Sequence, residues 1–145
     1  MFSIVFLLIF NFQNVAQAED ATFGVHLRLL KPIVTTVIQP LSFPDTNSGS
    51  NANVVVSSTS DGAAKVDVAG GANRTILSTV IEDRIEMASS SSSSSVAVDS
   101  FSVKGPASFD SDGNAKLSVG ATAHILASNE DANYSGSATL RVIYQ

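Results

Sequence analysis

Polar and apolar residues alternate at two-residue spacing along most of the chain, whereas the three-to-four-residue spacing of a helix is hard to find. Such alternation is typical of strands that bury one face. It predicts strands in these segments: 23–30, 33–43, 54–56, 64–68, 75–80, 96–103, 115–125 and 138–144. Pro40 predicts a kinked edge strand, and a change of parity near Asp99 and Ser100 predicts a bulge.

The number and spacing of these segments limit the possible fold classes. Seven or eight short antiparallel strands within one domain of this length are typical of an all-β, immunoglobulin-like Greek-key β-sandwich. The polar segments between them, such as 44–49 and the hairpin signal at Asp110–Asn114, have the composition of turns. We read the seven-serine tract Ser89–Ser95 as a solvated loop.

The first and last alternating segments stand out from the rest. The first places Phe23, Val25, Leu27 and Leu29 on one face, and the last does the same with Ala138, Leu140, Val142 and Tyr144. A strand that is apolar on one face and has a free edge is a template for pairing with another chain. We therefore consider the sandwich to be incomplete, with its core finished by a strand donated from outside.

The amino terminus predicts export. An apolar run covers residues 2–10 and is followed by Ala16-Gln17-Ala18, a small-x-small cleavage pattern, although no Lys or Arg precedes the run. We expect a signal peptide over 1–18, a buried helix being the alternative, then an N-terminal extension over 19–30 and a sandwich domain over 31–145. No second apolar stretch is long enough for a membrane span.

Composition excludes several classes of function. The chain of 145 residues has no cysteine, which rules out disulfides, thiolate metal sites and a cysteine nucleophile. Its net charge of −5, with no Lys/Arg cluster, argues against nucleic-acid binding. His26 and His124 fall on the polar parity of predicted strands and are interpreted as surface side chains. We therefore expect no catalytic residues, no cofactor and no metal.

The segment Asp110-Ser111-Asp112-Gly113-Asn114 is the nearest approach to a chemical motif. It resembles a calcium loop, but its glycine comes fourth instead of sixth, and Ala121 stands where a bidentate glutamate is needed. A tight hairpin turn explains the same residues. Asp110 and Asp112 would be the first carboxylates to test if the protein hydrolysed glycans.

The C-terminal block carries a family resemblance. Tyr134-Ser135-Gly136 followed by the alternating strand that closes on Val142-Ile143-Tyr144-Gln145 resembles a bacterial secreted family known as domain of unknown function 4402. Pro40-Leu41-Ser42-Phe43 and the segment 87–101 look like two further elements of that family. The family is similar to spore-coat-U and archaic chaperone–usher pilin domains, whose subunits are incomplete immunoglobulin-like sandwiches.

The resemblance implies a function and partners. Phe23, Val25, Leu27 and Leu29 would form the donor strand, and Ala138, Leu140, Val142 and Tyr144 would line the acceptor groove. The protein would be a non-catalytic subunit of a cell-surface fimbria, a homopolymer served by a periplasmic chaperone and an outer-membrane usher. The alternative is a self-contained secreted binding or coat module of adhesin type, in which residues 21–30 complete the sheet of their own chain.

Overall fold

The computed structural model describes residues 22–145, so the signal peptide predicted over 1–18 lies outside the described residues. Strands, turns and irregular segments make up the described chain, which contains no helix. Accordingly, residues 22–145 offer no helix with the length and apolar character needed to cross a membrane. The all-β class predicted from the two-residue alternation is confirmed.

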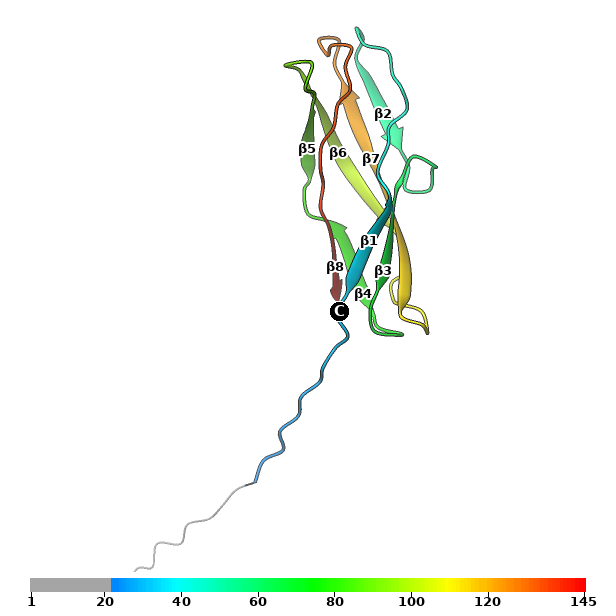
Figure 1. Cartoon of the computed structure of the whole chain (residues 1–145), viewed down its shortest axis with the longest axis vertical. Helices are drawn as coiled ribbons and strands as arrows, with labels where there is room; N and C mark the ends of the chain where they lie inside the picture. The colour runs from blue at the N-terminus through cyan, green and yellow to red at the C-terminus, as the bar shows by residue number, and fades with distance from the viewer. Residues whose placement is uncertain (1–21) are drawn as a thin grey trace, which may run out of the picture.

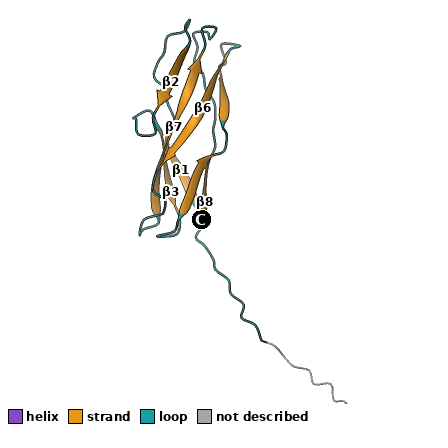
Figure 2. Cartoon of the chain, turned by 180° about the vertical axis from the view of Figure 1, so that it is seen from behind, coloured by secondary structure: helices purple, strands orange, loops and turns teal. Residues whose placement is uncertain are grey.

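Within residues 22–145, eight strands form two sheets (Figure 1, Figure 2). They are β1 (Val34–Gln39), β2 (Ala52–Val56), β3 (Ala64–Ala69), β4 (Ile76–Val80), β5 (Arg84–Ala88), β6 (Ser95–Lys104), β7 (Asn114–Ile125) and β8 (Leu140–Tyr144). The larger sheet has the order β1-β3-β7-β6-β5, and β2 also pairs with β7. The smaller sheet holds only β4 and β8.

Apart from β2 and β5, the strand order is that of an immunoglobulin sandwich with one position empty. In the constant-type fold, strands A, B, E and D form one sheet and C, F and G the other. Here β1-β3-β7-β6 corresponds to A-B-E-D, and β4-β8 corresponds to C-F. No strand formed by residues 22–145 takes position G, beside the free edge of β8.

Two irregularities shape the central strands. Strand β7 pairs with β3 up to Val119 and with β2 from Ala121 onward. Gly120 lies at this change of partner, where an added Cβ would come within 2.3 Å of the Val56 carbonyl oxygen. On β6 the pairing with β7 shifts between Asp99 and Ser102, and Ser100 has a φ of 55°. The bulge predicted from the change of parity is thus confirmed.

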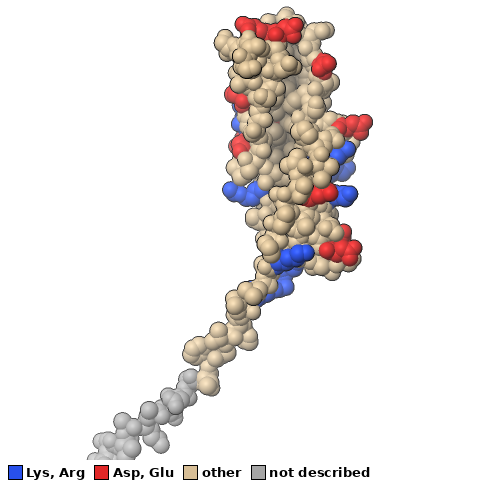
Figure 3. All heavy atoms as spheres, viewed as in Figure 1, with Lys and Arg blue, Asp and Glu red and all other residues tan. Residues whose placement is uncertain are grey.

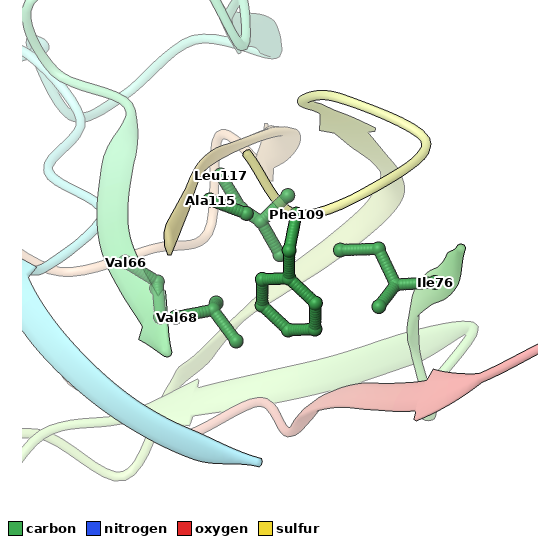
Figure 4. Close-up of a cluster of buried hydrophobic side chains, with 6 residues drawn as sticks. All are labelled: Val66, Val68, Ile76, Phe109, Ala115 and Leu117. Atoms are coloured by element: carbon green, nitrogen blue, oxygen red, sulfur yellow. The ribbon is translucent and has the colours of Figure 1, made fainter. Parts of the chain in front are cut away.

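One end of the sandwich has a closed core (Figure 4). Phe109 is 1% exposed and projects between Val68 and Ile76, which belong to opposite sheets. The rings of Phe109 and Tyr144 meet edge to face, with centroids 6.0 Å apart. The remaining buried members of this cluster are Val66, Ala115 and Leu117. The smaller sheet thus covers the larger one at this end.

The other core cluster is open. Val96, Val98, Ala121 and Ala123 of β6 and β7 are buried. The apolar side chains packed against them are only partly buried, namely Leu41, Phe43, Val54, Ile85, Met87, Phe101, Ile125 and Tyr134. The smaller sheet ends before this region, so only irregular segments cover this cluster, and they cover it incompletely.

Two segments differ from the sequence predictions. Residues 22–33 form no strand, and the first strand begins at Val34. Their alternation is that of a strand, but the described chain gives this segment no partner. Strand β5 was not predicted, because its charged residues Arg84 and Glu86 conceal the alternate residues Ile85 and Met87, which pack toward the core.

Candidate strand-accepting groove

An apolar groove lies between β1 and the segment that leads into β8. Its volume is about 430 Å³. Val66, Val98, Phe101 and Val119 of the larger sheet line it, together with Ile85 and Met87 of β5. One wall carries Thr35 and Val37, and the opposite wall is the backbone segment 136–140. The groove therefore lies over the inner face of the larger sheet at the empty strand position.

Both walls of this groove carry strand edges with free backbone groups. Within residues 22–145, β1 pairs only with β3, and β8 pairs only with β4. The outer N–H and C=O groups of each strand are therefore available to an added strand. Strand β1 also exposes several large apolar side chains to solvent: Val34, Val37 and Ile38 are 56%, 67% and 59% exposed.

The groove continues to the end of the sandwich farthest from the C-terminus. A second part, of about 640 Å³, shares Leu41, Phe43 and Met87 with the first. Figure 3 shows the hollow in this half of the molecule, with carboxylates at its end. The rim there contains Asp45, Glu130 and Asp131, which we call the acidic rim.

The predicted acceptor residues are divided between the groove and the core. Ala138 and Leu140 line the groove. Val142 and Tyr144 instead pack against the closed core beside Phe109 and Ile76. The alternation of the last strand indicates a row of side chains that point toward the core, and β8 has such a row. This row runs from the open end of the sandwich to the closed end. Sequence reasoning did not assign Val37, Leu41 or Phe43 to the groove, although they lie in the apolar segment 33–43.

Tyr144 holds the base of the N-terminal segment. Its hydroxyl donates a hydrogen bond to the Lys31 carbonyl oxygen (2.6 Å) and accepts one from the Gly71 N–H (2.7 Å). The Arg74 guanidinium lies 5.6 Å from the centre of its ring. Because the next residue is Pro32, Lys31 is also restricted to an extended conformation. These contacts fix where the chain leaves the sandwich.

The predicted donor residues project into solvent on a segment that points away from the sandwich (Figure 1). Phe23, Val25, Leu27 and Leu29 are 85%, 82%, 83% and 84% exposed. Four large apolar side chains at alternate positions are thus without cover, and the structure does not bring them to the groove of their own chain.

Glu82 secures the edge of the groove near β8. Its carboxylate accepts hydrogen bonds from the Thr139 N–H (2.7 Å) and the Thr139 hydroxyl (2.9 Å). These bonds lower the pKa of Glu82, since they favour the ionised form. No local signal in the sequence indicated this contact, because Glu82 and Thr139 are 57 residues apart in the chain.

His124 belongs to a polar cluster on the larger sheet. Its Nε2 lies 2.8 Å from Asp99 Oδ1 and its Nδ1 lies 2.9 Å from Asn53 Oδ1, so the ring joins three neighbouring strands. The hydrogen bond with His124, and then that with Ser100, lowers the pKa of Asp99. The Ser100 hydroxyl bonds to Asp99 and not to the imidazole, so these residues do not form a nucleophile–base pair.

The Asp110–Asn114 segment is a hairpin turn. Asp110 Oδ1 accepts the N–H groups of Asp112 (3.0 Å) and Asn114 (2.8 Å), and Gly113 has a φ of 82°. The Asp110 carboxylate therefore stabilises the turn. Over residues 22–145 no group of three or more His, Asp or Glu side chains is placed to hold a metal ion.

Comparison with known proteins gives a match to a family model. No curated protein and no solved structure matches the chain. The matching model carries the description Domain of unknown function (DUF4402) and covers residues 15–144, which include every strand of the sandwich. On this match, the chain belongs to the DUF4402 family.

Proposed function

We propose that this protein is a non-catalytic structural subunit of a cell-surface fibre. In this proposal, the N-terminal segment of one copy occupies the groove of the next. The observation that carries the proposal is the pairing of an empty strand position with an exposed, alternating apolar segment on the same chain. The immunoglobulin fold has a strand at the position that is empty here, and the N-terminal segment has the pattern of a strand but pairs with no sheet of the described chain.

The energetics favour such an exchange. Burying Phe23, Val25, Leu27 and Leu29 would contribute roughly 6–12 kcal/mol before the costs of association, at about 1.5–3 kcal/mol for each side chain. The free edges of β1 and β8 add main-chain hydrogen bonds on both sides of the inserted strand. Apolar contact and backbone pairing therefore act at the same place.

The geometry favours insertion into another copy over insertion into the same chain. To reach its own groove, the segment would have to reverse direction immediately before β1, at Lys31 and Pro32. Proline cannot adopt the positive φ that the second central residue of a type I′ turn requires, and the residue before proline avoids ψ near zero. The hydrogen bond from Tyr144 to the Lys31 carbonyl further opposes the reversal.

The family resemblance extends the proposal to the route of assembly. We expect export through the signal peptide over 1–18, a periplasmic chaperone and an outer-membrane usher as partners, and a final location at the cell surface. In the self-contained module that is the alternative, the N-terminal segment would fold back into its own groove, and the protein would remain a monomer.

A pair of matched variants tests the proposal on the chain that begins at residue 19. Leu27→Asp places a carboxylate on the row that would enter the groove, whereas His26→Asp makes a similar change on the opposite face. We expect the unmodified chain and His26→Asp to form oligomers that survive detergent without boiling, and Leu27→Asp to remain monomeric. Size-exclusion chromatography and unheated gel electrophoresis measure this.

Two outcomes would contradict the proposal. Equal assembly by both variants would show that the alternating row is not buried in the oligomer. The unmodified chain could also stay monomeric at all concentrations, with the same unfolding temperature as both variants. That result would show that the N-terminal segment does not act as a donor strand. A monomer that is destabilised only by Leu27→Asp would instead favour the self-contained module.

A further inference from the structure

The two ends of the sandwich differ in charge. The end farthest from the C-terminus is built by residues 40–56, 88–98 and 121–136, which contain no Lys or Arg. These stretches contribute three carboxylates, those of Asp45, Glu130 and Asp131, and all three line the groove. In Figure 3 this end shows red side chains and no blue ones. The acidic rim therefore has no neutralising cation in these stretches.

The part of the N-terminal segment nearest the sandwich has the opposite charge, whereas Glu19 and Asp20 precede it in the sequence. Residues 22–31 contain Arg28 and Lys31 and no carboxylate. Figure 3 shows basic side chains where this segment leaves the sandwich. Both cations lie near the end of the segment that joins the first strand: Arg28 stands beside Leu29, the last donor residue, and Lys31 follows the row.

Charge favours one direction for an inserted segment. The row from Phe23 to Leu29 spans about 20 Å at about 3.3 Å per residue, so its two ends lie in different parts of the groove. If the segment runs parallel to β1, Arg28 and Lys31 lie toward the acidic rim. If it runs in the opposite direction, both cations lie at the far end of the groove.

We propose that the acidic rim is the docking surface for the basic base of a second copy's N-terminal segment, so that subunits join end to end with one polarity. This inference rests on the proposed function and adds the surface that sets the direction of insertion. The second copy enters at the acidic end, and its segment runs parallel to β1 and antiparallel to β8. The attraction increases the rate of encounter and disfavours the reversed arrangement.

Engineered disulfides test the direction, because the chain has no cysteine of its own. Ala132 lines the groove beside the acidic rim. We expect a chain carrying Leu30→Cys and Ala132→Cys to form covalent oligomers under oxidation, and a chain carrying Thr22→Cys and Ala132→Cys to form few. Nonreducing gels of the assembled protein measure both. The reverse result, with Thr22→Cys linking to Ala132→Cys, overturns the inference.

Charge reversal tests the attraction itself. We expect Arg28→Glu with Lys31→Glu to slow assembly at low salt about tenfold or more, with the difference disappearing at high salt. Adding Asp45→Lys, Glu130→Lys and Asp131→Lys to the same chain should restore the rate. Lys65→Glu with Arg84→Glu makes an equal change of net charge on strands β3 and β5, between the two ends of the sandwich, and is the control.

The outcomes separate this inference from the proposed function. If the unmodified chain assembles and the reversal of Arg28 and Lys31 leaves its rate unchanged, fibre assembly stands and the role of the acidic rim is overturned. If the control slows assembly as much as the reversal does, net charge and not the rim is responsible, which also overturns it. Failure of the unmodified chain to assemble rejects both proposals.

Discussion

The closed and open ends of the sandwich contain similar sequence patterns and reach different degrees of burial. At the closed end, alternate residues of β3 and β7 meet Ile76 and Tyr144 of the smaller sheet, and Phe109 fills the space between them. At the open end, Val96 and Val98 are buried, but their neighbours Phe43, Met87 and Phe101 stay partly exposed. An alternating strand thus becomes half-buried or fully buried according to whether a second layer lies above it.

The largest expected contrast is between two phenylalanines. Phe109→Ala should reduce the free energy of unfolding by about 3–5 kcal/mol, since it opens a cavity in a closed core. Phe101→Ala, in the groove, should cost only about 1–2 kcal/mol, because the ring is already partly exposed. Urea unfolding of both variants in the Leu27→Asp background would compare them without assembly.

Equal losses for the two phenylalanines would show that the groove is as closed as the core. Repeating the comparison in the assembled protein sharpens it. If an inserted strand covers Phe101, its replacement should become more costly there, whereas the cost at Phe109 should stay the same.

Two glycines provide a second contrast. At Gly70 an added Cβ would lie 2.5 Å from Cε2 and Cζ of Phe109, whereas at Gly136 it would lie 3.2 Å from Met87 Cγ. Gly70→Ala should therefore destabilise the protein by about 1–3 kcal/mol, since the closed core cannot accommodate the methyl group. Gly136→Ala should change stability by less than about 0.5 kcal/mol, because Met87 can move into the groove. Thermal unfolding distinguishes them, and a large loss at Gly136 would argue that the open end is rigid.

A third contrast concerns the hydroxyl of Tyr144, which lies at the closed end but acts on the N-terminal segment. Tyr144→Phe keeps the ring against Phe109 and leaves the Gly71 N–H and Lys31 carbonyl without this partner. We expect a loss of about 1 kcal/mol in the free energy of unfolding. Faster hydrogen exchange should appear at Gly71. No change at that amide would indicate that the Tyr144 hydroxyl does not protect the Gly71 N–H.

Features that follow from local alternation and turn residues could be predicted from the sequence. Features that depend on which segment packs beside a strand could not. The bulge near Ser100 and the turn at Asp110–Asn114 were predicted because a change of parity and an Asp-Gly-Asn sequence are local signals. Whether the apolar row of residues 23–29 had a sheet to join could not be read from its pattern, since a strand that pairs within its chain has the same alternation as one that does not.

The groove was only partly predictable for the same reason. Ala138 and Leu140 are among its lining residues, but Val142 and Tyr144 continue the same row into the closed core. The point at which this row leaves the groove and enters the closed core depends on how far β4 pairs with β8. That pairing joins segments far apart in the chain, so it has no local signal. The contact between Glu82 and Thr139 joins residues far apart in the chain and has no local signal.

That contact gives the smallest expected effect, one that depends on pH. Since hydrogen bonds from Thr139 lower the pKa of Glu82 from its ordinary value of 4.5, ionised Glu82 stabilises the folded state above that value. This contribution disappears as pH falls through the lowered pKa. Glu82→Gln should therefore have a lower unfolding temperature than the unmodified chain near neutral pH, and the gap should narrow as pH falls below 4.5.

Asp83→Asn, which removes the neighbouring charge, is the control for Glu82→Gln. Because Glu82 holds the wall of the groove and not the closed core, Glu82→Gln should also increase hydrogen exchange at Thr139 while leaving the amide of Phe109 unchanged. An equal change at both amides would mean that the two ends unfold together. Exchange confined to Thr139 would instead show that the wall of the groove opens independently, as a segment that must admit another strand would need to do.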